Sequence, residues 1–261
     1  MKIIDIHAHI FPDKIAEKAS ANVGAFYNLS MKHDGKIRTL LDMGDRYGID
    51  RFLVHSVATT ADQVESINSF ISGVVKAYNG RFIGFATLHP DYKNTEKEID
   101  RAVSLGLKGI KLHPDFQRFH IDCKEAMGLY EILEGRLPLL IHTGDYRYEY
   151  SKPQRLAKVL DRFPRLQVIA AHFGGWSEWD KGAEALAGRN VYVDTSSTFY
   201  ANPLEKVRFL FKLFGSDHIM FGSDYPMWNP GTEIEFIRRL ELDERDLEKI
   251  MHENVEKLLG I

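Results

Sequence analysis

The feature that most constrains the fold is a two-part pattern repeated along the whole chain. A short apolar run is followed by a polar turn and then by a longer segment with the apolar spacing of an amphipathic helix. The apolar runs lie at residues 3–9, 51–56, 82–88, 109–113, 138–143, 167–172, 191–195 and 218–223. The helical segments lie at 62–78, 95–105, 123–135, 153–163, 179–187, 203–214, 231–240 and 243–259. Strands that alternate with helices pair in parallel through right-handed crossovers, so the pattern predicts a parallel α/β fold.

The number of repeats selects the architecture. Eight strand–helix units within 261 residues match a (β/α)8 TIM barrel that forms a single domain over residues 1–261. A doubly wound open sheet is the alternative, but no glycine-rich phosphate loop follows the first strand. Before the second strand, the spacing predicts helices over 14–21 and 37–47, with a long loop or insertion over 22–36.

Composition excludes several classes of protein. Hydrophobic residues make up 44% of the chain and charged residues 27%, which argues against disorder. The net charge of −3 is unlike that of a nucleic-acid-binding protein, and no apolar stretch is long enough to span a membrane. A single cysteine, Cys123, fits a reducing compartment, and the first strand begins too early to leave room for a signal peptide. We therefore expect a cytoplasmic protein.

Polar residues stand at the carboxyl ends of the predicted strands, where barrel enzymes carry their catalytic groups. Most of the eleven histidines are among them. In chain order these residues are His7, His9, His55, His89, Lys111, His113, His142, His172, Asp194, Ser196, Ser223 and Asp224. Neutral imidazoles combined with carboxylates bind Zn²⁺ and, less selectively, Fe²⁺, Mn²⁺ or Co²⁺. The pattern therefore predicts a metal centre that activates a water molecule.

The first strand carries two of these histidines one residue apart. Strand alternation places His7 and His9 on one face together with Ile3 and Asp5, where Asp5 lies deeper and supports the histidines. Several other strand-end residues have a simpler interpretation. His55 and His89 suit structural or pocket-lining roles, His113 lines the pocket or stacks under Pro114, and Asp194 caps the turn that follows it.

Four motifs occur in order at strand ends and carry a resemblance to a known family. They are Asp5-Ile6-His7-Ala8-His9, Leu140-Ile141-His142, Ala170-Ala171-His172-Phe173-Gly174-Gly175 and Phe221-Gly222-Ser223-Asp224-Tyr225-Pro226. The chain resembles the amidohydrolase superfamily, in particular its amidohydrolase-related (amidohydrolase 2) branch of aminocarboxymuconate-semialdehyde decarboxylase-like, metal-dependent hydrolases. The closing segment Glu253–Gly260 is similar to the last helix of that branch.

The resemblance implies a role for each matching residue. His7, His9, His142 and Asp224 match the positions that hold the catalytic metal, which is usually zinc. His172 matches either a ligand of a second metal or an acid/base group beside the bound water. Asp224 is implied both as a ligand and as the group that moves the proton of the water, so Asp224 and His172 are the candidate catalytic residues.

The number of metal ions depends on the fourth strand. In binuclear members of the superfamily a lysine on this strand becomes carboxylated and bridges two metals. Lys111 stands at about that place. We expect a single metal ion, with two as the alternative, in which case Lys111 would be carboxylated rather than free to meet a substrate carboxylate.

The loops after the strands predict the kind of substrate. Aromatic residues accompany Arg118 after the fourth strand and Arg147 after the fifth. With Lys111 and His113, these arginines are the candidate substrate-binding residues and suit a small, anionic molecule, since arginine binds carboxylates in a bidentate manner. Phe26 and Tyr27 are candidates for a lid over the pocket.

The main functional hypothesis is a metal-dependent hydrolase, in which an activated water attacks an amide, lactone or related carbonyl. The alternative is metal-dependent, non-oxidative decarboxylation of an aromatic or unsaturated carboxylic acid. A barrel that only binds a metal or a metabolite is disfavoured, because all five metal-site residues are present. The expected partner is a small-molecule substrate, with neither nucleic acid nor membrane, and a homo-oligomer stays open.

Overall fold

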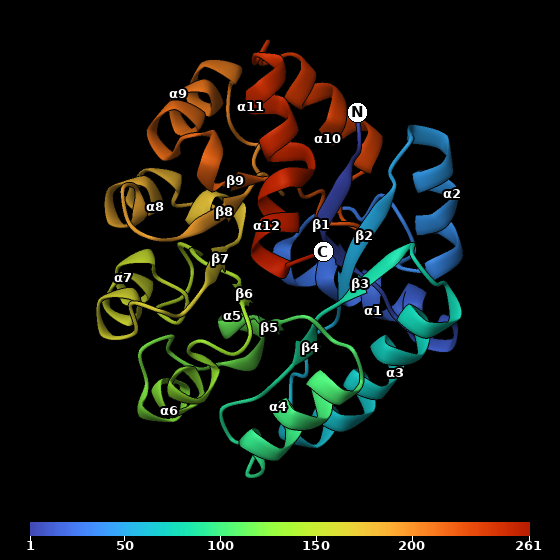
Figure 1. The fold of residues 1–261 in the computed structure, drawn as a ribbon, viewed down its shortest axis with the longest axis vertical. Helices are drawn as coiled ribbons and strands as arrows, with labels where there is room; N and C mark the ends of the chain where they lie inside the picture. The colour runs from blue at the N-terminus through green and yellow to red at the C-terminus, as the bar shows by residue number, and fades with distance from the viewer.

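The computed structural model describes residues 1–261 and contains a ring of parallel strands surrounded by helices (Figure 1). The strand segments are β1 (Ile4–His9), β2 (Arg51–His55), β3 (Phe82–Gly84), β4 (Ala86–Thr87), β5 (Ile110–Leu112), β6 (Leu139–Ile141), β7 (Val168–Ala170), β8 (Tyr192–Asp194) and β9 (Ile219–Met220). All eight predicted strands are present, because β3 and β4 are two halves of one barrel strand. Phe85 separates them, and its N–H still donates to the carbonyl of Val54, 3.0 Å away.

The ring is closed by the first and last strands. Neighbouring strands pair in parallel in the orders β1-β2-β3 and β4-β5-β6-β7-β8-β9. Ala8 forms a parallel bridge with Tyr225, and the N–H of Ile6 donates to the carbonyl of Phe221 at 2.9 Å. The structure is therefore a (β/α)8 barrel and not an open sheet, as the sequence predicts.

The helices follow the strands in the expected order. They are α1 (Asp13–Tyr27), α2 (Ile37–Tyr47), α3 (Val64–Ala77), α4 (Thr95–Ser104), α5 (Pro114–Gln117), α6 (Lys124–Leu133), α7 (Pro153–Arg162), α8 (Trp179–Leu186), α9 (Leu204–Phe214), α10 (Pro230–Arg238), α11 (Glu244–Glu248) and α12 (Asn254–Leu259). Short 3-10 turns precede α3, α8 and β9, and a π-helical turn over Lys249–Glu253 joins α11 to α12.

The predicted end of the first helix is wrong. α1 continues six residues past Ala21 to Tyr27 and ends where Asn28 adopts a left-handed conformation. Its buried side is made of Ala16, Ser20 and Gly24, small residues at helical spacing. Because a stripe of small residues lacks the large apolar side chains that mark an amphipathic helix, the pattern does not reveal it.

The apolar core has two parts. A large cluster lies between the strands and the surrounding helices. A second cluster fills the barrel itself and includes Leu140 and Ile169 of the strands and Val255 and Leu258 of α12. In Figure 1, α12 lies across the centre of the ring beside the start of β1. It thus covers the amino-terminal end of the barrel and leaves the carboxyl ends of the strands for the site.

The first strand departs from regular alternation. Its pairing with β2 shifts register between Asp5 and Ala8, which is a β-bulge. Ile4 and Ile6 point into the barrel, as His7 and His9 do beyond the bulge, whereas Ile3 belongs to the outer cluster. The expectation that Ile3 shares a face with both histidines is therefore wrong, because one extra residue reverses the alternation.

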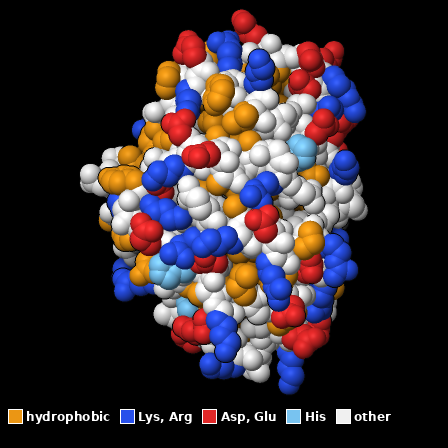
Figure 2. Space-filling model, turned by 90° about the vertical axis from the view of Figure 1, so that its left-hand side faces the viewer, with side chains coloured by type: hydrophobic (Ala, Val, Ile, Leu, Met, Phe, Trp, Pro, Cys, Tyr) orange, Lys and Arg blue, Asp and Glu red, His pale blue; other side chains and the backbone are white.

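The surface carries no long apolar or single-sign stripe on the face shown in Figure 2, where basic and acidic side chains alternate. None of the helices combines the length and the hydropathy that crossing a membrane would require.

Candidate active site

A narrow pocket opens at the carboxyl ends of the strands. All five predicted metal-site residues line it, and apolar and aromatic side chains complete the wall. The lining residues are His7, His9, Val23, Tyr27, Met31, His113, Phe116, His142, His172, Asp224, Pro226 and Met227. The strand ends therefore bring His7 and Asp224, which are 217 positions apart in the chain, into one pocket.

Asp194 fixes the orientation of His7. One carboxylate oxygen, Oδ2, accepts a hydrogen bond from Nδ1 of His7 at 2.8 Å. The other accepts from the backbone N–H groups of His172 at 2.9 Å and Ser196 at 3.0 Å. Because Nδ1 of His7 carries the proton, its Nε2 presents a lone pair to the pocket, where the ammonium of Lys111 lies 3.1 Å away.

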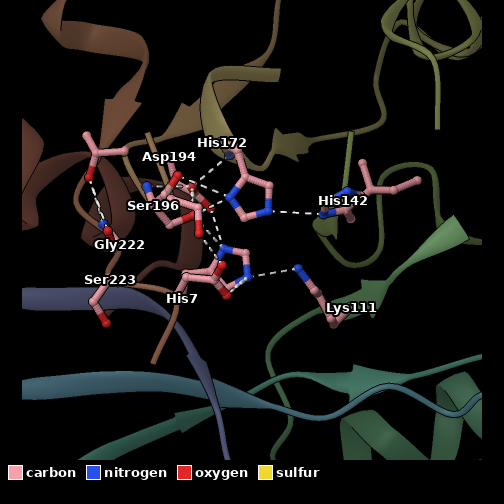
Figure 3. Close-up of polar contacts among 12 residues, drawn as sticks. His7, Lys111, His142, His172, Asp194, Ser196, Gly222 and Ser223 are labelled. Atoms are coloured by element: carbon pink, nitrogen blue, oxygen red, sulfur yellow. Dashed lines mark hydrogen bonds and ion pairs between the residues drawn. The ribbon is translucent and has the colours of Figure 1, made fainter. Parts of the chain in front are cut away.

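His172 and His142 are held in the same way by backbone carbonyls. Nδ1 of His172 is 3.1 Å from the carbonyl oxygen of Ser196, and Nε2 of His142 is 3.1 Å from that of Gly144. A carbonyl accepts only, so these nitrogens carry the protons. The remaining nitrogens, Nε2 of His172 and Nδ1 of His142, are both unprotonated and face each other at 3.0 Å (Figure 3). Two lone pairs that face each other at this distance repel, and a cation bound beside them would relieve this repulsion.

Asp224 completes the donor set. Its Oδ1 lies 3.5 Å from Nε2 of His7 and 3.6 Å from Nε2 of His9. These separations are long for hydrogen bonds but close to the ~3.4 Å expected between two atoms that bind one metal at about 2.1 Å in tetrahedral geometry. Its other oxygen accepts a hydrogen bond from Ser197, whose Oγ accepts in turn from Nε1 of Trp228 at 2.7 Å.

Burial adjusts the charges of these groups. Desolvation, with Lys111 and neighbouring imidazoles adding to it, lowers the pKa of His7 and His9 well below the usual value. Burial lowers the pKa of His172 to about 4 and raises the pKa of Asp224 to about 7. Neutral imidazoles are the form that binds a metal, so the charge state of the pocket histidines fits a divalent cation.

The backbone is unusual where the site is built. His172, Ser197 and Asp224 adopt φ values of 60°, 50° and 61°, in the left-handed region that non-glycine residues rarely occupy. Such conformations concentrate at functional sites, where the surrounding contacts compensate their energetic cost. Here they turn the chain sharply just after the strands, where His172 and Asp224 line the pocket and Ser197 bonds to Asp224.

The candidate substrate-binding residues occupy different places. His113 lines the pocket, and Lys111 lies fully buried beside it, where burial lowers its pKa to about 8. Arg118 is exposed at the end of α5 and does not line the pocket. Arg147 does not line it either. Its guanidinium forms two hydrogen bonds to Asp145, at 3.0 and 2.7 Å, and another to the carbonyl of Phe26.

Sequence reasoning missed some residues and gave others too small a role. Asp194 was expected only to cap a turn, yet it orients two histidine-bearing strand ends. His55 is fully buried, has no hydrogen-bond partner on either ring nitrogen and lies edge-on to His9 with ring centroids 4.4 Å apart. Asp115 lies 3.5 Å from Nε2 of His142. The signal for Asp194 was available, since it ends a strand next to the predicted ligands.

Comparison with known proteins identifies the family. A family model described as Amidohydrolase (Amidohydro_2) matches residues 4–261. The chain belongs to the amidohydrolase-2 family. The predicted resemblance is therefore confirmed, and the chain is an enzyme of a metal-dependent barrel family.

Among curated relatives, the chain is 28% identical over 127 residues to decarboxylase orsB of Emericella nidulans. The match covers 40% of this chain and spans 38% of the relative. Among solved structures, it is similar to a dihydroxybenzoic acid decarboxylase from Polaromonas sp. JS666 with bound manganese and the inhibitor 2-nitroresorcinol. That similarity has a TM-score of 0.76 and 17% identity, and it covers 99% of this chain and 97% of that one.

A second solved structure carries a different activity in its description. It is a probable 2-pyrone-4,6-dicarboxylic acid hydrolase from Acinetobacter baumannii with citric acid bound. The TM-score is 0.72, the identity 17%, and both chains are covered completely. At this level of identity the similarity establishes the shared barrel fold and leaves the reaction to be argued from the site.

Proposed function

We propose that the protein is a metal-dependent decarboxylase that removes CO₂ from a small aromatic carboxylic acid. The observation that carries this proposal is the composition of the pocket, which combines one carboxyl group, Asp224, with a cluster of imidazoles and an apolar, aromatic wall. A flat, apolar ring with an anionic group fits such a wall. The similarity to known decarboxylases supports the same proposal.

The metal would be held by His7, His9, His142, His172 and Asp224, which present lone pairs or a carboxylate oxygen to the pocket. When bound, a divalent cation supplies a Lewis acid that polarises the oxygen atoms of the substrate. Manganese and zinc are both compatible with ligands of this kind. We propose one ion, with Lys111 left uncarboxylated, so that its buried ammonium beside the pocket attracts the anionic substrate through its charge.

Decarboxylation requires a proton at the ring carbon. When the bond between that carbon and the carboxylate breaks, its electron pair stays on the ring carbon and CO₂ leaves. Asp224 is the acidic side chain that lines the pocket, and its carboxyl group can carry a proton when it is not bound to the metal. We assign Asp224 the delivery of the proton to the ring carbon, after which solvent reprotonates its carboxylate.

Hydrolysis of a lactone or amide is the second candidate. The same carboxylate of Asp224 would accept a proton from water, and a relative described as a hydrolase has this fold. The two reactions differ in what the substrate must carry. Hydrolysis needs an ester or amide carbonyl, whereas decarboxylation needs only an aromatic acid.

A product assay separates the two candidates. The protein is loaded with Mn²⁺ or Zn²⁺ and incubated with hydroxybenzoates, including 2,6-dihydroxybenzoate and 5-carboxyvanillate, and in parallel with aromatic lactones and amides. We expect CO₂ and the corresponding phenol from at least one acid. The Asp224→Asn variant should lose at least about 100-fold in kcat. Ring-opened acid or free amine without CO₂ would instead establish the hydrolase.

A further inference from the structure

A tyrosine outside the metal cluster forms part of the pocket wall. Tyr27 is the last residue of α1, and its hydroxyl lies 2.7 Å from Nε2 of His113, which follows β5. Both side chains line the pocket. The hydrogen bond joins two segments 86 residues apart, so it fixes the position of the α1 end over the strand ends.

The direction of this hydrogen bond follows from a second contact of the same ring. The backbone N–H of Phe116 donates to Nδ1 of His113, at 3.3 Å. Nδ1 therefore has no proton, and an imidazole always keeps at least one, so Nε2 of His113 carries it. Consequently His113 donates to the hydroxyl oxygen of Tyr27, and the hydroxyl hydrogen of Tyr27 is not used in this contact.

Both rings are held firmly in place. His113 is stacked between Phe116 and His142, with ring centroids 3.8 and 3.9 Å away. The ring of Tyr27 packs against Trp176 at 4.6 Å between centroids and lies 5.3 Å from the guanidinium carbon of Arg147. No other protein group hydrogen-bonds the hydroxyl of Tyr27. A rigid phenol with an unused O–H thus faces the pocket.

We propose that Tyr27 is a substrate-positioning residue that donates a hydrogen bond to an anionic oxygen of the bound aromatic acid, with His113 setting the direction of its O–H. This inference rests on the proposed function for the class of ligand. A hydrogen-bond donor that is already in position before binding discriminates strongly between ligands. A ligand without the matching oxygen leaves the hydroxyl unpaired. Tyr27 therefore selects among aromatic molecules of similar size.

Binding of defined probes tests the role of Tyr27. The manganese-loaded protein and its Tyr27→Phe variant are titrated with benzoate, 2-hydroxybenzoate, 2,6-dihydroxybenzoate and 2-nitroresorcinol, and Kd is measured calorimetrically. We expect Tyr27→Phe to weaken binding by about 10- to 100-fold, the usual effect of removing a hydrogen bond to a charged group. Tyr146→Phe is the matched control, because Tyr146 lies on the loop after β6 and is 69% exposed.

Each outcome decides the proposal. A loss seen with every carboxylate places the donor on the carboxylate, and a loss confined to hydroxylated probes places it on a phenolic oxygen. Equal Kd values for wild type and Tyr27→Phe, or wild-type protein that binds none of the probes, would overturn the proposal. If the probes bind and Tyr27→Phe weakens them while no CO₂ is formed, the decarboxylase proposal fails and Tyr27 keeps its role.

The part played by His113 has its own test. His113→Phe keeps an aromatic ring between Phe116 and His142 but removes the donor to Tyr27. If His113 acts through Tyr27, the double variant His113→Phe/Tyr27→Phe should bind the probes no more weakly than Tyr27→Phe alone. Losses that multiply in the double variant would show that His113 contacts the ligand independently and would overturn its positioning role.

Discussion

At the scale of single residues, the site depends on hydrogen bonds that hold one ring nitrogen of each of three histidines. A carboxylate holds one nitrogen of His7, and carbonyl oxygens hold one nitrogen of His142 and one of His172. These contacts decide which nitrogen is unprotonated, and all three unprotonated nitrogens face the pocket. The site therefore requires particular hydrogen-bonding groups behind the histidines as well as the histidines themselves.

Replacing the carboxylate that orients His7 tests this view. In Asp194→Asn the side chain keeps its size but loses its charge and one acceptor. We expect the affinity for Mn²⁺ or Zn²⁺ to fall by about 10- to 100-fold, measured by competition with a chromophoric chelator. Asp91→Asn is the control, since the Asp91 side chain is 76% exposed. An unchanged affinity would assign Asp194 to folding alone.

The contact between Ser197 and Asp224 gives a second prediction at this scale. Ser197 donates to Oδ2 of Asp224 and directs the other oxygen to His7 and His9. In Ser197→Ala we expect kcat to fall by about 10-fold with little change in KM, because Asp224 loses its orientation while the substrate pocket is preserved. Ser66→Ala, on the exposed side of α3, should behave as wild type. A change in KM alone would contradict this assignment.

The positions of residues along the predicted strands were sufficient to predict which side chains form the candidate metal site. His7, His9, His142, His172 and Asp224 stand at strand ends, and the barrel geometry brings them to one pocket. The tautomers and the role of Tyr27 depend on contacts across the pocket, which no local pattern encodes. The decarboxylase alternative gained support over the hydrolase because of the relatives and the aromatic wall.

At the scale of elements, Arg147 links the end of α1 to the barrel, in addition to the hydrogen bond between Tyr27 and His113. The guanidinium of Arg147 bonds to Asp145 and to the carbonyl of Phe26, and it lies 4.7 Å from the ring centroid of Phe26. The strand pattern predicted that Phe26 and Tyr27 follow the first strand near the pocket. It did not predict the helix that carries them, because the buried side of that helix is made of small residues.

Loosening this attachment should affect α1 selectively. We expect Arg147→Gln to speed hydrogen exchange of residues 22–31 by roughly 5- to 30-fold, which corresponds to the loss of one hydrogen bond and its cation–π contacts. Exchange is followed by mass spectrometry, with Lys158→Gln as the exposed control. If exchange is unchanged while KM rises, Arg147 binds substrate directly, as first hypothesised.

At the scale of the whole molecule, the barrel depends on its interior as well as on its closure. Leu140 is fully buried in the cluster that fills the barrel and that α12 covers. The repeat of strands and helices predicted this architecture, since each unit needs its neighbours to bury its apolar faces. The bulge in β1 was not predictable, because only pairing with β2 reveals the extra residue.

A cavity in this interior should destabilise the entire domain. We expect Leu140→Ala to lower the free energy of unfolding by about 2 to 5 kcal/mol, measured by denaturant titration. Leu213→Ala, at a position 42% exposed on α9, should change it by less than about 1 kcal/mol. Similar values for the two variants would mean that the barrel interior relaxes around the missing side chain.

The closure of the barrel between β1 and the segment after β9 also determines the order of events during biosynthesis. His7 and His9 are synthesised before the other ligands, and Asp224 is made 217 residues after His7. At typical elongation rates this interval lasts roughly 10 to 45 s. The edge of β1 that pairs with Tyr225 stays open throughout that time, and the complete donor set exists only after Asp224 has been made. Metal binding by the complete donor set therefore follows the synthesis of Asp224.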